Sequence, residues 1–450
     1  MINILLFFLN LVPLSICFWI SFKRKRLYSV FFLGLIAQHI ISIFYLNEAV
    51  DFFTEEVVTK GQLLMIVGNF VFFLLIFYLD KILLFKNKIK TEELINYTKS
   101  VNNNKFSWFI IFLSIFVLIS LILSSGGVVS LLAGDWISRR EDGTSSSIIY
   151  RFSVLSSFIV YPSSWFFYLK KKIIPLSLSL TFSVIFILII GSRAAAITLV
   201  CCIFFSIMFD ETDQSSKIRK IGVLGLLGFL FYNVLRYVRG YGLAFILNPI
   251  QSFEAILQRN IEFSGGESDV YFSYFFVVDS DIDESSLGNT LIRILLIYVP
   301  RSLFPWKPQD ITHSLWEDFF RSGLFDSNEY YHLMYSAAKQ GNYGSLHPTF
   351  WGDAYYNLET VGFLIYPIFF TTLFIFVERF LYKRLRRNTL LFFFSIFPFV
   401  GSCYLFMSRG NIVIGMGYIA YLIPITLFLY MVYNLLFKFF SKFIPFPVLF

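Results

Sequence analysis

The sequence predicts an all-α polytopic membrane protein with about eleven transmembrane helices and one large segment outside the membrane, between spans eight and nine. Hydrophobic residues make up 57% of the 450 residues and charged residues only 15%, whereas a soluble domain has about 45–50% apolar and about 25% charged residues. The mean hydropathy is +0.70. This composition excludes a soluble enzyme, a nucleic-acid binder and a secreted disulfide scaffold as descriptions of the whole chain.

Long apolar runs recur along the chain, and a spanning helix needs about 20 apolar residues. The first run is not expected to be a signal peptide, because its basic residues, 23–26, follow the apolar stretch instead of preceding it. The run at 194–209 is short for a span. The expected spans are residues 2–22, 27–46, 62–80, 106–124, 148–169, 173–190, 194–209, 221–238, 358–378, 389–407 and 411–433.

The loop charges predict the orientation of these spans. Lys and Arg concentrate in cytoplasmic loops, and most of the 37 basic residues fall on one side when the amino terminus is placed outside. The carboxyl terminus is then inside, and the acidic residues Glu55 and Glu56 lie in the first outer loop. Three regions follow: a bundle over 1–238, an outer segment over 239–357 and a second bundle over 358–450. Loops as long as this outer segment are usually functional.

Several basic residues fall on the outer side, against the orientation rule. Arg193 follows Gly191 and Ser192 at the start of an expected helix, and a helix amino terminus with a guanidinium is a good anion site. Arg236 and Arg239 are three residues apart, hence on one helical face, where they could grip a diphosphate bidentately. The alternative for each is contact with lipid headgroups.

Two further motifs combine basic and small or aromatic residues. The Pro-rich stretch Val299–Pro308 holds Arg301 and Lys307 beside Phe304 and Trp306. It suits a charged lipid headgroup whose sugar rings pack on aromatic side chains, or it is an interfacial turn anchored by the Trp. The apolar run just before it is expected to lie in the interface or to re-enter the membrane. Ser408-Arg409-Gly410 repeats the small–Arg–small pattern of Arg193.

Few residues are suited to acid–base chemistry. His347 lies just before span nine and could accept a proton from a hydroxyl near neutral pH, or it caps the next helix. Glu267 and Asp353 are rival bases. His39 lies in an apolar run and is expected to be a packing residue. The four cysteines lie in apolar runs, and no metal-binding or nucleotide-binding motif is present, so neither a metal nor a cofactor is expected.

Three local signals carry a resemblance to a known family: Ile190-Gly-Ser-Arg193 followed by three Ala, the stretch Val299–Pro308, and Leu346-His-Pro-Thr349 running through Trp351-Gly to span nine. With the many spans and the long outer segment, they make the chain similar to the Wzy-type O-antigen polymerases. The order and spacing look most like the enterobacterial common antigen branch. The likeness in architecture covers the whole chain.

The resemblance implies glycosyl transfer on the periplasmic face of the bacterial inner membrane, with undecaprenyl diphosphate as the leaving group. The substrate is an undecaprenyl-diphosphate-linked oligosaccharide, and a chain-length-regulating co-polymerase is the expected partner beside membrane lipids. His347 would orient or deprotonate the acceptor hydroxyl, with Glu267 or Asp353 as its substitute, and Trp306 and Trp351 would stack on sugars. The candidates for diphosphate binding are Arg193, Arg236, Arg239, Arg301, Lys307 and Arg409.

Three other functions stay open. A flippase for the same lipid-linked repeat is one, although transporters commonly show internal repeats and midplane sites, and no repeat is seen. A ligase that attaches finished polysaccharide uses related Arg and His chemistry. A structural protein that binds a chain-length regulator through its outer segment is the third.

Overall fold

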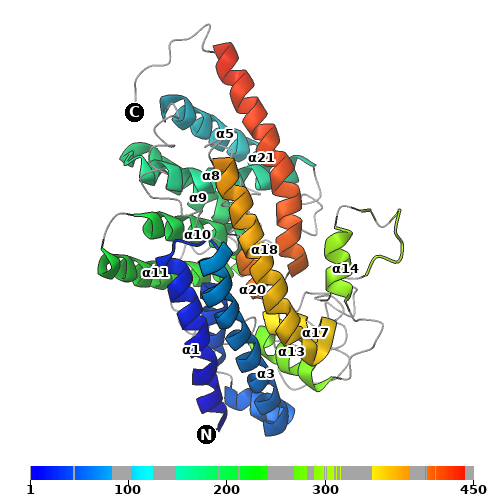
Figure 1. The fold of residues 1–450 in the computed structure, drawn as a ribbon. Helices are drawn as coiled ribbons and strands as arrows, with labels where there is room; N and C mark the ends of the chain where they lie inside the picture. The colour runs from blue at the N-terminus through cyan, green and yellow to red at the C-terminus, as the bar shows by residue number, and fades with distance from the viewer. Residues whose placement is uncertain are drawn as a thin grey trace. The chain divides into compact units, whose positions relative to one another are not determined.

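The computed structural model shows a helical chain (Figure 1), and every regular element among the described residues is a helix. These helices begin and end close to many of the expected spans. The structure describes residues 2–43, 46–83, 103–124, 148–190, 193–210, 213–241, 268–280, 288–297, 299–300, 302–308, 311, 315, 347–385, 401, 403–410 and 412–440. The helices are α1 (Ile2–Lys23), α2 (Ser29–Ser42), α3 (Leu46–Leu83), α5 (Asn103–Ser124), α8 (Ile148–Leu169), α9 (Ile173–Ile190), α10 (Arg193–Phe209), α11 (Gln214–Tyr241), α13 (Ser268–Asp279), α14 (Asn289–Leu295), α17 (Thr349–Leu358), the 3-10 turn η6 (Glu359–Val361), α18 (Gly362–Leu385), α20 (Leu405–Ser408) and α21 (Ile412–Phe440).

Within the described residues, six helical stretches are long and apolar enough to cross a membrane. They are Ile2–Lys23, Ala49–Tyr78, Phe106–Ser124, Phe152–Leu169, Ile173–Ile190 and Thr349–Leu381. The all-helical class and the presence of several helices able to span a membrane are therefore confirmed for the described residues, whereas the count of eleven stays a prediction. Most of the expected span 389–407 lies outside the described residues.

The chain divides into two compact units. Unit 1 contains Met1–Lys88, Ser264–Phe380 and Cys403–Ala420, and unit 2 contains Ile89–Phe263, Leu381–Ser402 and Tyr421–Phe450. Each unit gathers segments that are distant in the sequence. The two units therefore cut across the three regions expected from the sequence.

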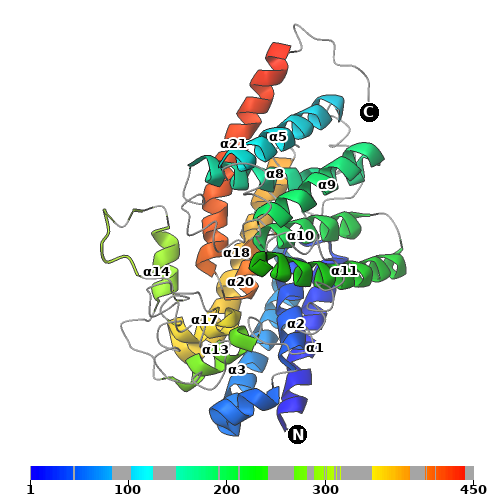
Figure 2. The same cartoon turned by 180° about the vertical axis from the view of Figure 1, so that it is seen from behind.

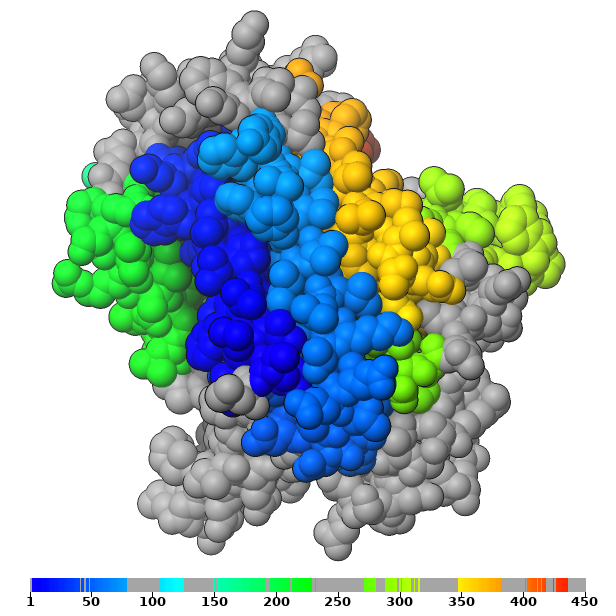
Figure 3. All heavy atoms as spheres, turned by 60° about the horizontal axis from the view of Figure 1, so that its bottom comes forward, coloured from blue at the N-terminus to red at the C-terminus, as the bar shows by residue number. Residues whose placement is uncertain are grey.

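In unit 1, α1 and α3 run parallel and lie side by side, as Figure 3 shows in dark and light blue. Polar side chains join them in two layers. Thr59 donates a 3.1 Å hydrogen bond to Asn3 Oδ1. Two helical turns further along α1, Asn69 donates a 2.9 Å bond to Asn10 Oδ1. The Asn10 amide in turn donates to the Gln62 carbonyl at 3.1 Å. These bonds fix the register of the two helices.

Helix α17 folds back on α18 as an antiparallel pair. Gly362 begins α18 so close to the Ala354 carbonyl that a Cβ would collide with it. Near the start of α17, the Phe350 ring lies 5.6 Å from that of Tyr366 and 5.0 Å from that of Phe370, both on α18. Helix α13 packs on both α17 and α3 (Figure 1), and its Tyr274 hydroxyl donates a 2.6 Å bond to the Gly61 carbonyl.

A buried ion pair ties the turn between α1 and α2 to α18. Arg26 Nη1 lies 3.6 Å from Glu378 Oε2, and both side chains are almost fully buried. Glu378 Oε1 also accepts a 2.6 Å hydrogen bond from the Leu27 amide. Next to this pair, Tyr28 stacks on Phe374 with ring centroids 5.8 Å apart. Both charges are therefore held in the interior of unit 1, away from its surface.

Unit 2 contains α5, α8, α9, α10 and α11, of which α9, α10 and α11 follow one another in Figure 2. Serines lie at the contact of α8 and α9, where the Ser163 and Ser179 hydroxyls are 2.6 Å apart. Small residues let apolar helices approach closely and bond across the contact. At one end of the unit, Asp210 Oδ2 accepts bonds from Tyr168 at 2.8 Å and Lys220 at 2.7 Å.

Glu378→Gln should destabilise the protein, because it leaves the buried Arg26 charge without its carboxylate. Breaking a buried ion pair costs about 3–5 kcal/mol, so the thermal unfolding midpoint in detergent should fall clearly. Arg379→Gln is the matched control, since Arg379 is the next residue on α18 and is exposed. Equal midpoints for the two variants would contradict the role given to the pair.

Candidate functional site

Two motifs that are distant in the sequence meet in unit 1. Gly410 has a φ of +78° and packs so tightly against Thr349 that a Cβ would collide with the Thr349 backbone. Positive φ and close approach are the two conditions that favour glycine. The contact places Ser408-Arg409-Gly410 beside His347-Pro348, which directly precede Thr349. His347 and Arg409 are both half-buried, so each retains surface that a substrate could touch.

The start of α17 lies at this junction. The Thr349 hydroxyl accepts a 3.2 Å hydrogen bond from the Gly352 amide and so satisfies one donor of the first turn. The chain reverses between α17 and α18 at Glu359–Val361. Because the two helices are antiparallel, His347 lies at the opposite end of the pair from this reversal. The sequence placed residues 349–357 in the outer segment, where interfacial or re-entrant helices were expected, and in the structure they form a buried helix.

Asp353 is fully buried on α17. Its Oδ1 accepts a 2.7 Å bond from the Tyr366 hydroxyl and a 2.9 Å bond from the Asn357 amide. The Asn357 Oδ1 accepts the Thr290 amide at 2.9 Å, which connects α14 to the same cluster. In this arrangement the carboxylate positions α17 against its neighbours.

The two candidate tryptophans have opposite environments. Trp351 is 3% exposed, and its ring stacks on Phe363 at 5.4 Å and lies 5.6 Å from Phe72. Trp306 is 64% exposed, with Phe304 edge-on at 5.0 Å. Of the two rings, that of Trp306 is the accessible one, and Trp351 forms part of the core of unit 1.

Lys307 and its surroundings form a compact turn after α14. The Lys307 ammonium donates to the Val299 carbonyl at 3.0 Å and the Ile297 carbonyl at 3.4 Å, while Arg293 donates to the Pro308 carbonyl at 2.8 Å. Cations near a helix carboxyl terminus stabilise it. Leu295 and Leu303 are 83% and 70% exposed, as suits the interfacial position expected for this run.

In unit 2, helix register brings three candidate arginines level with one another. Helices α10 and α11 are antiparallel, because two contacts pair rising residue numbers on one with falling numbers on the other. Lys220 bonds to Asp210. Gly228 lies opposite Val200, since a Cβ added to Gly228 would lie 3.8 Å from the Val200 side chain. Continuing this register places Arg193, the first residue of α10, level with residue 235 on α11. Arg193, Arg236 and Arg239 therefore occupy the same end of the α10–α11 pair, opposite Asp210. Arg301 and Glu267 lie outside the described residues.

Sequence reasoning missed a polar interior in α1, α2 and α3. His39 is buried as expected, with Nε2 2.9 Å from the Phe7 carbonyl and its ring stacked on Phe7 at 4.3 Å. A cavity of about 30 Å³ adjoins it, which is large enough to hold a water molecule. It is lined by Leu14, Leu35, Gln38, His39, Ser42, Met65, Asn69, Tyr271, Thr349 and Trp351. The spacing of seven between Asn3 and Asn10, and between Gln62 and Asn69, was the available signal.

Burial raises the pKa of Tyr274 well above its usual value. The phenol therefore stays neutral and remains the donor to the Gly61 carbonyl. The four cysteines are buried and form no disulfide. Among the described residues, no group of three or more His, Cys, Asp or Glu side chains gathers as metal ligands.

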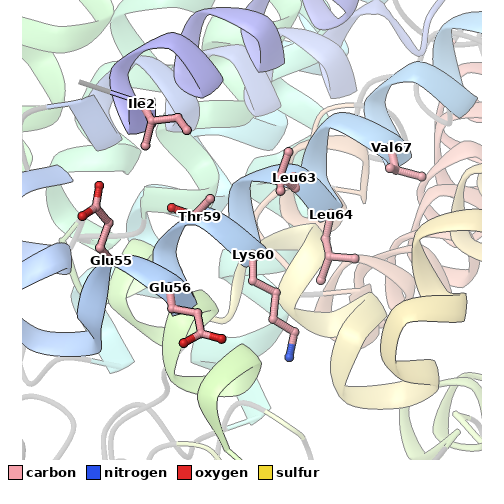
Figure 4. Close-up of a pocket in the computed structure, with 8 residues that line it drawn as sticks. All are labelled: Ile2, Glu55, Glu56, Thr59, Lys60, Leu63, Leu64 and Val67. Carbon is pink, nitrogen blue, oxygen red and sulfur yellow. The ribbon is translucent and has the colours of Figure 1, made fainter.

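A wider groove opens near the amino terminus of α1 (Figure 4). Its volume is about 740 Å³, and it is lined by Ile2, Glu55, Glu56, Thr59, Lys60, Leu63, Leu64 and Val67. The Lys60 ammonium lies 3.4 Å from the Tyr355 hydroxyl on α17. From the sequence, the two glutamates were only part of an acidic outer loop.

No protein-family model matches the chain, and no curated protein or solved structure matches it either.

Gly410→Ala should separate the two halves of the His347–Arg409 site. A non-glycine residue in left-handed conformation costs about 1–2 kcal/mol, and the contact with Thr349 adds to this cost. Thermal unfolding in detergent should show a lower midpoint. Gly225→Ala is the control: Gly225 lies on α11 with open space around it, so Ala should stabilise that helix slightly. A Gly410→Ala midpoint no lower than that of Gly225→Ala would refute the tight junction.

Proposed function

We propose that this chain is a Wzy-type O-antigen polymerase, a membrane glycosyltransferase that joins undecaprenyl-diphosphate-linked oligosaccharide repeat units on the periplasmic face of the inner membrane. The acceptor sugar hydroxyl forms the new glycosidic bond, and the bond to the donor's undecaprenyl diphosphate breaks. The hydroxyl proton passes to a base, and the diphosphate leaves with the electron pair. No metal or cofactor is assigned to the reaction.

The observation that supports this proposal best is the junction of the His347 and Arg409 motifs at Gly410 and Thr349. One side chain suits proton transfer near neutral pH, and the other suits a phosphate oxygen. Fixed cations in a partly dry site stabilise a departing anion strongly. His347 is therefore assigned as the base and Arg409 as a ligand of the leaving diphosphate.

The remaining basic residues are assigned to diphosphate binding in the same proposal. Arg193, Arg236 and Arg239 share one end of the α10–α11 pair, a set of positions suited to one diphosphate. Arg301 and Lys307 belong to the turn that carries the exposed Trp306, which would stack on a sugar ring. Asp353 acts as a positioning residue, and Glu267 stays a substitute base.

The charges of unit 1 support the proposed orientation. Arg24 and Arg26 lie at the carboxyl end of α1, whereas Glu55 and Glu56 lie near the amino terminus of α1, in the groove that Ile2 also lines. Basic residues favour the cytoplasmic side. The amino terminus is accordingly assigned to the periplasm and the carboxyl terminus to the cytoplasm. A chain-length-regulating co-polymerase remains the proposed partner.

A transporter for the same lipid-linked repeat is the second candidate. Polar side chains inside spanning helices mark transport pathways in many membrane proteins. Asn10, Gln62 and Asn69 are buried between α1 and α3, and this polar layer is the observation that favours transport. The ligase is a third possibility within the same chemistry.

A gel of surface polysaccharide from a deletion strain distinguishes these functions. Polymerase loss leaves glycolipid with a single repeat but removes the long ladder, because flipping and ligation continue. The cloned wild-type gene should restore the ladder. A deletion strain that lacks even the single repeat would overturn the polymerase proposal in favour of transport or ligation.

His347→Ala should remove the ladder while the protein level stays unchanged, because general-base catalysis contributes about 10²–10⁴-fold to rate. The measurement is polymer length and amount in the deletion strain carrying the variant. His313→Ala, a histidine of the same outer segment without a motif around it, should keep the ladder. If the two variants have equal activity, His347 has no part in the chemistry.

A further inference from the structure

The groove of Figure 4 combines charged and apolar surface on one side of α3. Glu55, Glu56 and Lys60 are exposed at one end of it. Leu63 and Val67 follow along the same helix and are 48% and 46% exposed, and Ile2 of α1, 52% exposed, lies at the Glu55 and Thr59 end of the groove. A ligand that fills this groove therefore needs a charged head and an apolar chain.

The position of the groove along α3 indicates where such a ligand lies. Beyond Lys60, the exposed large side chains of α3 are apolar or aromatic: Leu63, Val67, Phe70, Leu74, Phe77 and Tyr78. These residues span about 24 Å at 1.5 Å per residue, most of the roughly 30 Å of a hydrocarbon core. The charged end of the groove thus lies at headgroup level, and the apolar end lies along the acyl chains.

The charges select the kind of head. Helix α3 is kinked at Thr54, which has φ 70° and ψ 154°, so Glu55 and Glu56 stand in the first turn of the segment that follows. Carboxylates there already complement the positive helix end, and they attract a cation and repel a polyanion. Lys60 is held beside Tyr355, with its ammonium 5.7 Å from the ring centroid, and offers one positive charge.

We propose that this groove binds a zwitterionic aminophospholipid of the phosphatidylethanolamine class. The lipid ammonium lies at the end of the groove that Glu55 and Glu56 line, and its phosphate lies at Lys60. One acyl chain follows Leu63 and Val67 toward the membrane interior. A polyprenyl diphosphate carries only negative charge in its head and would face both carboxylates, so this site is distinct from the one assigned to the substrate.

Native mass spectrometry of the purified full-length protein with equal amounts of phosphatidylethanolamine and phosphatidylglycerol tests the proposal. The wild type should retain the ethanolamine lipid several-fold more than the glycerol lipid. The double variant Glu55→Gln and Glu56→Gln should lose this preference. Lys60→Gln should reduce the retention of both lipids, because both contain a phosphate.

Asp51→Asn is the matched control, since Asp51 is an exposed carboxylate of α3 that does not line the groove. It should keep the wild-type preference. The proposal is overturned if the wild type shows no preference, if Asp51→Asn loses as much as the double variant, or if a second copy of the chain occupies the groove instead of lipid. The readout is bound lipid and not polymer, so its failure leaves the proposed enzymatic function untouched.

Discussion

Unit 1 depends on the need to satisfy polar groups inside apolar helices. An amide or a carboxylate away from water is costly unless another group of the protein bonds to it. Asn10 bonds to the Gln62 carbonyl and to Asn69, and Oδ1 of Asp353 accepts bonds from Asn357 and Tyr366. Oε1 of Glu378 accepts the Leu27 amide, and Arg26 supplies the opposite charge. Apolar contacts between these helices would permit many registers, whereas each of these polar contacts permits one. The positions of α1, α3, α17 and α18 in the unit follow from them.

The same contacts explain how a catalytic group can be placed on a helix of only ten residues. Helix α17 is too short to be stable by itself, and it is held by the aromatic cluster around Phe350 and by the bonds of Asp353. Its first turn then lies at a fixed place next to Gly410. His347 and Arg409 are on the two segments of the chain that meet there. Preorganisation of this kind is what electrostatic catalysis needs. In the proposed reaction, the buried carboxylate serves the base indirectly, by fixing the helix that follows it.

Much of the helical framework could be predicted from apolar run length alone. The expected spans 148–169 and 173–190 coincide with α8 and α9, and 2–22 differs from α1 by one residue. Run length alone did not predict the packing of α17, because the mutual bond of Asp353 and Asn357 and the Tyr366 hydroxyl that accompanies it cannot be read from the sequence. The sequence also suggested the same role for Trp306 and Trp351, although one is exposed and the other is buried. The exposure of Trp351 depends on Phe72, which is distant in sequence, and on Phe363 of the next helix. The contact between the segments that carry His347 and Arg409 could not be predicted for the same reason: a glycine indicates a special backbone conformation, but not which residue packs against it.

Unit 1 is discontinuous, and this has a consequence for biosynthesis. Its three segments end at residues 88, 380 and 420, so a growing chain holds α1, α2 and α3 in the membrane long before α17 is made. The contact at Thr349 forms only after Gly410, which belongs to the last segment of the unit, has left the ribosome. Until that point the polar faces of α1 and α3 can join each other, but the His347–Arg409 site does not exist. The enzyme proposed here is therefore assembled only near the end of translation, and a chain that terminates before residue 410 inserts most of its helices without acquiring a site.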